Sequence, residues 1–357
     1  MADAHGVHRR WSLLSLLAGL LGWLMAQTAW AQTPPDSASP ARDDWASAGF
    51  LYADGAMPVY AHGDHVEPYF AVKALLMAHR LGLDVRPEAQ AFADWLRPRQ
   101  SPDGRFARYC RANPASPWVE CGAADADDAL AALWCLLAMD VLTDRRSDAS
   151  CERSLDLLVR LWNPKQQVYR TMLDRPIAQF ADNVEILATL QRLWQPDARE
   201  RLRSALERGG DRLSVADLRR GMEKTFAYSF AEGVFPHKAA DFSDPSQPRD
   251  FYPDGVTPLY IWVYGLQPDA AARAGWYRWK QAYRESWLGG RADVFPWGLA
   301  AVAAETVGDR DSSRRWMEQS DAWRAAGRWN LLEEGVWRGL HHRLSAEAQA
   351  PLRTGQP

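Results

Sequence analysis

The chain has 357 residues, of which 47% are hydrophobic and 24% are charged. This composition provides for a large core and excludes a globally disordered chain. The formal net charge of −3 gives no basic field for nucleic acid or for an anionic membrane surface, so we expect neither as a partner.

The N-terminal segment predicts an export signal. Basic residues at 8–10 precede an apolar, Leu-rich run over 11–25, and a small-residue cleavage site ends at Ala31. The run is short for a membrane span, which needs roughly 20 residues. We therefore expect a signal peptide over 1–31, a disordered Pro/Ser-rich leader over 32–44, and a soluble protein in the periplasm or outside the cell, free of the membrane after cleavage.

The four cysteines fit an oxidising compartment. Cys110 and Cys121 flank a loop that contains two prolines, and we expect these two to form a disulfide. Cys135 lies in an apolar helical pattern and is interpreted as a small buried residue, while the sequence indicates no partner for Cys151. No spacing of Cys and His resembles a zinc site, and we expect neither a metal nor a cofactor.

From Asp64 onward, apolar residues recur at helical spacing between short breaks that contain Pro, Gly or Asp. Weak strand signals occur at 104–109 and at 167–171. The helical pattern predicts helices at Glu67–Leu81, Arg86–Leu96, Ala126–Leu142, Ser150–Leu161, Ile177–Trp194, Pro196–Arg208, Ser214–Phe230, Gly255–Leu266, Pro268–Trp287, Trp297–Val307 and Arg310–Arg328.

The series of helices shows no strong change of composition, which predicts a single all-α domain over 45–345 followed by a tail at 346–357. No helical repeat period is visible, and this favours helix hairpins closed into an (α/α)6 toroid over an open solenoid. The sequence lacks a Gly-rich phosphate loop and an alternating βαβ pattern, so a nucleotide-binding fold is disfavoured.

The chain carries 18 tryptophans. Trp134 and Trp194 lie in helical patterns and are interpreted as core residues. Trp118 and Trp297 stand in breaks between helices. Flat aromatic side chains exposed in a cleft suit the apolar faces of sugar rings, and packing in the core is the alternative for each of them.

Carboxylates stand at three junctions between a loop and a helix. Glu67 precedes Pro68, which suits the first position of a helix. Asp125 is expected to N-cap an Ala/Leu-rich helix that has further acids in its first turn. Asp254 lies in a Tyr-Pro-Asp-Gly turn ahead of a later helix. Because each of the three precedes a helix, a ring of hairpins would bring them to one end.

These segments resemble glycoside hydrolase family 8, the inverting endoglucanases, chitosanases and xylanases that include the periplasmic cellulase of bacterial cellulose synthesis. Val66-Glu67-Pro68 resembles the family's Ser-Glu-Gly segment, and Ala124-Asp-Ala-Asp127 resembles its Asp-rich helix start. Tyr252-Pro-Asp254 resembles its later Tyr-Asp segment, and Asp103-Gly-Arg-Phe106 its short Asp-Gly segment. The resemblance extends from about Gly55 to Leu266.

The resemblance implies an (α/α)6 enzyme that cleaves a β-linked polysaccharide, such as a β-1,4-glucan, within the chain and with inversion. Glu67 would be the general acid, Asp254 the general base, and Asp125 would bind and distort the sugar. The polysaccharide is the expected partner, together with an exopolysaccharide synthesis machinery. Further residues expected at the substrate are Asp127, Tyr69, Tyr252, Trp118 and Trp297.

Two alternatives stay open. A polysaccharide lyase or unsaturated-uronide hydrolase on a similar toroid would use Tyr252 or His65 as base and Arg105 to neutralise a uronate. Departures from the family motifs, such as Val66 and Pro68 around Glu67, suit instead a non-catalytic glycan-binding or secretion accessory protein.

Two further groups of side chains are noted. His62 and His65 flank Asp64, and we interpret them as a solvated loop rather than as a metal site or proton shuttle, because no third ligand is evident. Asp182 and Glu185 lie on a predicted helix that could border the same cleft, and they are kept as further candidates.

Overall fold

The computed structural model describes residues 44–231 and 251–349. The chain divides after Ala41, and every described residue belongs to the second unit, Arg42–Pro357. The predicted signal peptide and all of the predicted leader except Asp44 lie outside the described residues. Within the described part of the chain, no helix combines the length and the apolar character that a membrane span requires.

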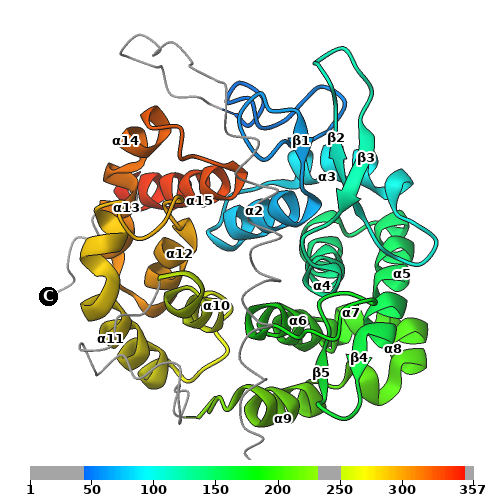
Figure 1. Cartoon of the computed structure of the whole chain (residues 1–357). Coiled ribbons are helices and arrows are strands. Elements are labelled where there is room, and N and C mark those ends of the chain that lie inside the picture. The colour runs from blue at the N-terminus through cyan, green and yellow to red at the C-terminus, as the bar shows by residue number, and fades with distance from the viewer. Residues whose placement is uncertain (1–43, 232–250, 350–357) are drawn as a thin grey trace, which may run out of the picture. The chain divides into compact units, whose positions relative to one another are not determined.

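Six helices of this unit form a closed inner ring (Figure 1). Each helix packs on the next in chain order, and the last packs on the first, which closes the circle. This arrangement confirms the predicted all-α toroid. The six helices are α2 (Pro68–Arg80), α4 (Asp127–Leu137), α6 (Phe180–Leu193), α10 (Thr257–Val263), α12 (Gly298–Val307) and α15 (Leu331–Gln349).

An outer layer of helices surrounds the ring. Among its contacts, α5 packs on α4, α9 on α6, α11 on α12, and α13 on both α12 and α15. Short helical turns η1 to η4 connect parts of the two layers. The outer helices are α3 (Arg86–Leu96), α5 (Arg145–Leu161), α7 (Pro196–Arg201), α8 (Arg203–Gly209), α9 (Val215–Phe226), α11 (Asp269–Leu288), α13 (Arg310–Glu318) and α14 (Ser320–Ala325). The turns are η1 (Arg97–Arg99), η2 (Ala138–Leu142), η3 (Gly210–Leu213) and η4 (Phe251–Gly255).

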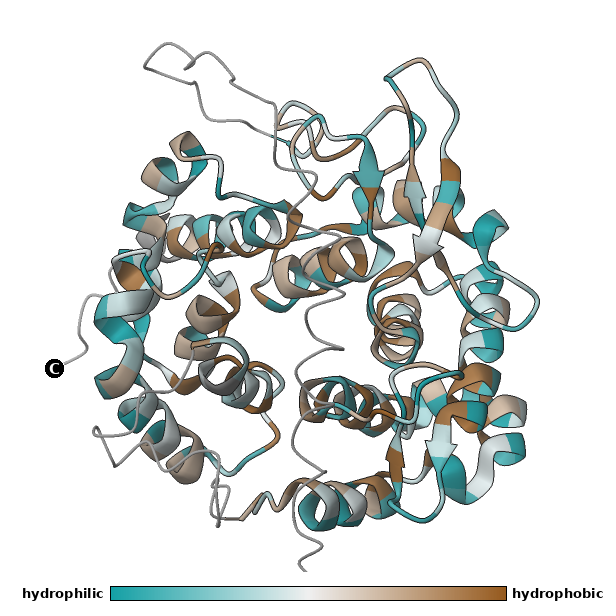
Figure 2. Cartoon of the chain, in the orientation of Figure 1, coloured by the Kyte–Doolittle hydropathy of each residue, from teal (hydrophilic) through white to brown (hydrophobic). Residues whose placement is uncertain are grey.

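Burial follows these two layers. Helices α4 and α12 are buried almost all round, as their Ala- and Leu-rich sequences require. Outer helices such as α5 and α13 bury one side and expose a charged one. Figure 2 shows the same contrast, with more hydrophilic colouring on α5 and α13 than on α4 and α12. The core therefore lies between the layers.

The inner helices begin at one end of the ring, because contacts join one start to the next. The N-cap of α2, Glu67, accepts a hydrogen bond from the residue 125 amide just before α4. The Thr171 carbonyl, ahead of α6, accepts from the first amide of α4. Tyr252, ahead of α10, stacks on Trp297, the N-cap of α12. The first amide of α12 donates to Glu333 in the first turn of α15.

The predicted helices are found with changed ends. Helix α5 begins at Arg145 rather than at residue 150, because Asp144 caps it by accepting from the amides of residues 146 and 147. The helix predicted over 126–142 passes into the π-helical turn η2. The stretches 196–208 and 310–328 each contain two helices. Helix α15 was not among the predicted helices, although it closes the ring.

Short strands lie beside the start of α2. An antiparallel sheet has the order β1 (His65–Val66), β2 (Ala107–Cys110) and β3 (Val119–Ala123), and a second pair joins β4 (Trp162–Asn163) to β5 (Val168–Tyr169). Strand β2 overlaps the predicted strand signal at 104–109 and extends one residue beyond it, and β5 falls within the signal at 167–171. Strand β3 lies partly in the stretch interpreted as a loop, and it was not among the predicted strands.

Both disulfides lie between neighbouring elements. Cys110 of β2 is bonded to Cys121 of β3, as predicted. Cys135 of α4 is buried, as predicted, and it is bonded to Cys151 of α5, a pairing that the sequence did not indicate. The two helices pack against each other, and this contact brings the two sulfur atoms together.

Tryptophans account for much of the packing. Trp134 is fully buried, as predicted. Trp276 and Trp279 of α11 stack with their ring centroids 4.9 Å apart. Trp194 retains 36% of its surface exposed, so its interpretation as a core residue was wrong. It is the C-cap residue of α6.

Candidate active site

Glu67 connects strand β1 to helix α2. Its extended backbone makes it the N-cap, and Pro68 occupies the first helical position, as predicted. One carboxylate oxygen, Oε1, lies 3.5 Å from the amide nitrogen of Tyr69. The residue is only 2% exposed, so its carboxyl group is removed from bulk water although it stands at the end of a helix.

The Glu67 carboxylate joins two other segments of the chain. Its Oε2 accepts a hydrogen bond from Arg108 Nε of strand β2 at 2.8 Å. Its Oε1 also accepts from the backbone amide of Asp125 at 3.3 Å. The structure therefore brings together Glu67 and Asp125, two of the three predicted acidic positions. Arg108 was not predicted, because only the pairing of β1 with β2 places it there.

Opposing effects act on the Glu67 carboxyl group. Burial raises its pKa, the Arg108 guanidinium lowers it, and the nearby Asp125 carboxylate raises it. The net effect is that the pKa of Glu67 lies above its usual value. A carboxyl group in this environment holds its proton to higher pH than a solvated glutamate, as a general acid must.

Asp125 does not cap helix α4. The N-cap is Ala126, whose side chain has no hydrogen-bonding group, so the prediction that Asp125 caps the helix was wrong. The Thr171 carbonyl instead accepts from the amides of Asp127 and Asp128. The Asp125 side chain is exposed as a result, and it is free to meet a ligand.

The two acids that follow are buried in the first turn of α4. Burial raises the pKa of Asp127 to about 6. Asp128 is fully buried, and burial followed by the Asp182 carboxyl raises its pKa well above the usual value. Of these acids, Asp125 alone is exposed, so Asp127 and Asp128 form the wall behind it.

Asp182 of α6 lies behind the start of α4. Its Oδ2 accepts a hydrogen bond from Thr171 Oγ1 at 3.2 Å. Burial, the Glu185 carboxylate and Asp125 together raise the pKa of Asp182 to about 7. Because Asp125 contributes to this raised pKa, Asp182 belongs to the same cluster of acids as Asp125. Asp182 was one of the further candidates noted in the sequence.

A buried ion pair lies within the inner ring. Lys73 Nζ of α2 is 2.9 Å from Glu185 Oε1 of α6, and both side chains are at most 1% exposed. Tyr69 donates to Glu185 Oε2 at 2.8 Å, and Tyr264 of α10 donates to Oε1 at 3.0 Å. Tyr69 is thus a buried part of this network, and its predicted contact with a sugar stays a prediction.

An aromatic pair stands ahead of α10 and at the start of α12. Tyr252 is 57% exposed and stacks on Trp297, with ring centroids 5.6 Å apart and an interplanar angle of 21°. Partial burial, followed by Tyr260, Asp125 and Asp182, raises the pKa of the Tyr252 hydroxyl to about 12. The pair therefore stands close to the acids.

Asp254 lies in the adjacent turn η4, and its side chain is outside the described part of the structure.

Trp118 is half-buried in the loop closed by the first disulfide. The Arg111 guanidinium lies between the Tyr52 and Trp118 rings, 4.0 Å and 4.4 Å from their centroids. Trp118 Nε1 donates to Asp54 at 3.0 Å. These contacts engage much of its surface in packing, so it is less open to a ligand than Tyr252.

The other noted groups have separate surroundings. Arg105 pairs with Asp103 at 2.7 Å. His65 of β1 lies beside Arg108, and burial followed by that guanidinium lowers its pKa. Within 44–231 and 251–349, no cluster of three or more His, Cys, Asp or Glu side chains is arranged to hold a metal ion.

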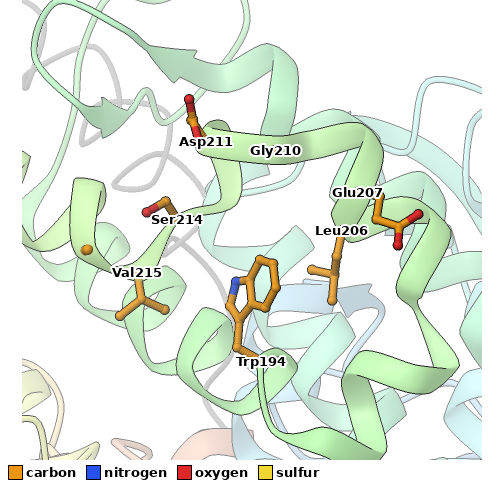
Figure 3. Close-up of a pocket in the computed structure, with 8 residues that line it drawn as sticks. Trp194, Leu206, Glu207, Gly210, Asp211, Ser214 and Val215 are labelled. Atoms are coloured by element: carbon orange, nitrogen blue, oxygen red, sulfur yellow. The ribbon is translucent and has the colours of Figure 1, made fainter.

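A pocket of about 510 Å³ opens at a different place on the outer layer (Figure 3). Trp194 forms one wall, Leu206 and Glu207 of α8 form another, and Ser214 and Val215 lie at the start of α9. This pocket lies beyond the C-terminal end of α6, whereas Asp182 is in the first turn of that helix. It is separate from the acidic cluster.

Comparisons with known proteins inform the fold. No protein-family model matches the sequence, and no curated protein matches it. A solved structure described as a novel alpha-amylase from Clostridium perfringens has a TM-score of 0.51 and 11% identity, over 82% of this chain and 94% of that one. A GH8 endo-beta-1,4-glucanase from an Achatina fulica gut metagenomic library has a TM-score of 0.49 and 19% identity, over 86% and 100%. The first likeness shows a shared fold, and function rests on the residues of the site.

Proposed function

We propose that the chain is an inverting glycoside hydrolase that cuts within a β-linked polysaccharide such as a β-1,4-glucan. One juxtaposition carries the proposal: the buried Glu67 carboxyl group, with its raised pKa, is hydrogen-bonded to the backbone of the exposed Asp125. A proton donor beside an acid that can contact a sugar is the arrangement that glycoside cleavage needs. The motif resemblance described above supports the assignment of both residues.

In the proposed reaction, Glu67 donates its proton to the glycosidic oxygen as the bond from that oxygen to the anomeric carbon breaks. A water molecule attacks the anomeric carbon from the opposite face, and Asp254 accepts a proton from this water. The product sugar thereby has the inverted configuration. The two carboxyl groups must stand roughly 6.5–9.5 Å apart to admit the water.

The sugar contacts follow from exposure. We assign Asp125 to the hydroxyl groups of the sugar at the cleavage position, since its side chain is exposed beside Glu67. Tyr252 and Trp297 form an aromatic surface against which the apolar face of a neighbouring sugar can stack. Asp127, buried behind Asp125, supports this position from the first turn of α4.

We also propose that the protein works in the periplasm or outside the cell. The two disulfides support an oxidising compartment. The N-terminal sequence supports export.

Release of reducing ends from β-glucan, chitosan and xylan tests the proposal. We expect the wild type to cut at least one of them and Glu67→Gln to lose at least about 10²-fold in kcat, since general acid catalysis typically contributes 10²–10⁴-fold. Asp254→Asn should lose activity similarly. Proton NMR of the first products should show the α anomer, as inversion requires.

Glu120→Gln is the matched control, because Glu120 is an exposed acid on the neighbouring strand β3. It should retain wild-type activity. Full activity of Glu67→Gln would contradict the proposal. Glycan binding without turnover by the wild type would contradict it too and would support a non-catalytic glycan-binding protein.

A further inference from the structure

The ion pair between Arg108 and Glu67 has a role beyond holding β2 to α2. We propose that Arg108 is a positioning residue for hydrolysis: its guanidinium orients the Glu67 carboxyl group in the free enzyme and stabilises the carboxylate left after proton transfer. This inference rests on the proposed function of Glu67 as the general acid. The positions of the carboxyl oxygens support it.

The two oxygens of Glu67 have different partners. Oε1 faces two backbone amides, those of Tyr69 at 3.5 Å and Asp125 at 3.3 Å. Because a backbone N–H group only donates, Oε1 is suited to accept. Oε2 faces Arg108 Nε at 2.8 Å. The acidic proton therefore belongs on Oε2, the oxygen that the guanidinium occupies when Glu67 is charged.

The exposure of the pair suits an exchange of partners. The Glu67 side chain is 3% exposed, whereas that of Arg108 is 35% exposed. When Oε2 takes up a proton from solvent, the guanidinium can therefore withdraw toward solvent while the carboxyl group stays in place. A glycosidic oxygen then takes the proton from Oε2, and Arg108 Nε returns to donate to the new carboxylate. A charge-assisted hydrogen bond of this kind is among the stronger ones in proteins.

The charged groups that face Glu67 define what removal of Arg108 would do. The Asp125 carboxylate disfavours a charged Glu67, and Arg108 favours it. Arg108 also lowers the pKa of His65 on strand β1. The titration of His65 must therefore be separated from that of Glu67. Without the guanidinium, burial and Asp125 act on Glu67 unopposed, and the carboxyl group should keep its proton to higher pH.

The test compares Arg108→Gln and Arg108→Met with the wild type. Carboxyl ¹³C NMR of the Glu-labelled full chain, with the Glu67 signal assigned by its loss in Glu67→Gln, reports the titration midpoint of Glu67 directly. We expect this midpoint to rise by about 1 pH unit, since an adjacent opposite charge typically moves a carboxyl pKa by 1–3 units. The alkaline limb of the kcat/KM profile should move by a similar amount, with kcat reduced more than KM is changed.

Two controls make the result specific. Arg105→Gln removes an arginine that pairs with Asp103 rather than with Glu67, and it should leave the Glu67 midpoint unchanged. His65→Gln identifies any titration that belongs to His65. Either Arg108 variant suffices, provided that circular dichroism shows it to be folded.

The outcomes are distinguishable. An unchanged Glu67 midpoint in a folded Arg108 variant would overturn the inference. A raised KM with an unmoved alkaline limb would also overturn it, by making Arg108 a sugar contact. If no glycan is cut by the wild type, the proposed hydrolase function fails, while the NMR midpoint still decides whether Arg108 controls the charge of Glu67.

Discussion

Acidic residues near the starts of the inner helices look alike in the sequence and have different environments in the fold. Glu67 is buried and paired with Arg108, Asp125 is exposed, and Asp128 is fully buried. In the proposed function only the first two act on a bound sugar, one as a proton donor and the other as a contact. Their difference arises from neighbours distant in the sequence rather than from local spacing.

The buried pair of Lys73 and Glu185 illustrates the same point. Lys73 lies on the buried face of α2, where an unpaired charge would cost several kcal/mol. Glu185 and the hydroxyl of Tyr69 satisfy it. The pair links α2 to α6 in the interior of the protein.

Tyr252 offers a test of the proposed sugar surface. Its exposed ring stacks on Trp297, and an aromatic stacking contact is worth roughly 0.5–1.5 kcal/mol. We expect Tyr252→Ala to raise KM by up to about tenfold, as 1.4 kcal/mol corresponds to a factor of 10, with a smaller effect on kcat. Initial-rate kinetics on the best glycan measure this. Tyr277→Ala, which removes an equally exposed ring (58%) on the outer helix α11, should leave KM unchanged. An equal effect of both variants would refute the assignment.

At the scale of elements, closure of the ring depends on close contact between α15 and α2. A Cβ added at Gly335 would lie 2.5 Å from the carbonyl oxygen of Ala74, and one at Gly339 would lie 2.7 Å from Leu81 Cβ. Glycine at these positions lets the last inner helix approach the first. Each glycine costs the isolated helix about 1 kcal/mol relative to alanine, and packing compensates for that cost.

Gly335→Ala should therefore destabilise the protein although it favours the helix. We expect a loss of about 1–3 kcal/mol, the range for overpacked positions, measured by urea unfolding. Gly122→Ala is the control, because nothing lies within 4 Å of a Cβ built at that exposed position. Equal or greater stability of Gly335→Ala would show that α2 and α15 are not held by this close approach.

For the whole molecule, buried carboxyl groups determine how stability depends on pH. Burial raises the pKa of Glu333 and, assisted by Glu185 and Asp125, that of Asp182, each to about 7. Unfolded carboxyl groups titrate near 4. Between about pH 4 and 7 the folded state keeps protons that the unfolded state has lost, so these groups make stability fall as pH rises through that window. Carboxyl groups with a lowered pKa, such as Asp103 at about 2, change the stability only at pH values below this range.

Glu333→Gln isolates one such contribution. Glutamine can still accept the hydrogen bond from the amide of Gly298, and it does not ionise. We expect the fall in Tm between pH 5 and pH 8 to be smaller in the variant than in the wild type by about a few °C, since 1 kcal/mol moves the Tm of a large domain by about 2–4 °C. Thermal unfolding by circular dichroism measures it. Identical falls would mean that Glu333 ionises in the folded protein without cost.

Local patterns in the sequence determined much of this protein. Apolar spacing located most helices, Pro68 located the start of α2, and the short loop between Cys110 and Cys121 predicted their disulfide. The all-α ring followed from many helices without a repeat period. These features depend on neighbours within a few turns of chain, and the sequence displays such neighbours directly.

The tertiary structure alone decided the remaining features. Arg108 meets Glu67 because β2 pairs with β1, Cys135 meets Cys151 because α4 packs on α5, and Thr171 rather than Asp125 satisfies the start of α4. In each case the partner comes from another segment, and its arrival depends on how the helices close into a ring. Helical periodicity specifies which face of a helix is buried, but the packing of the ring selects the residue that meets it.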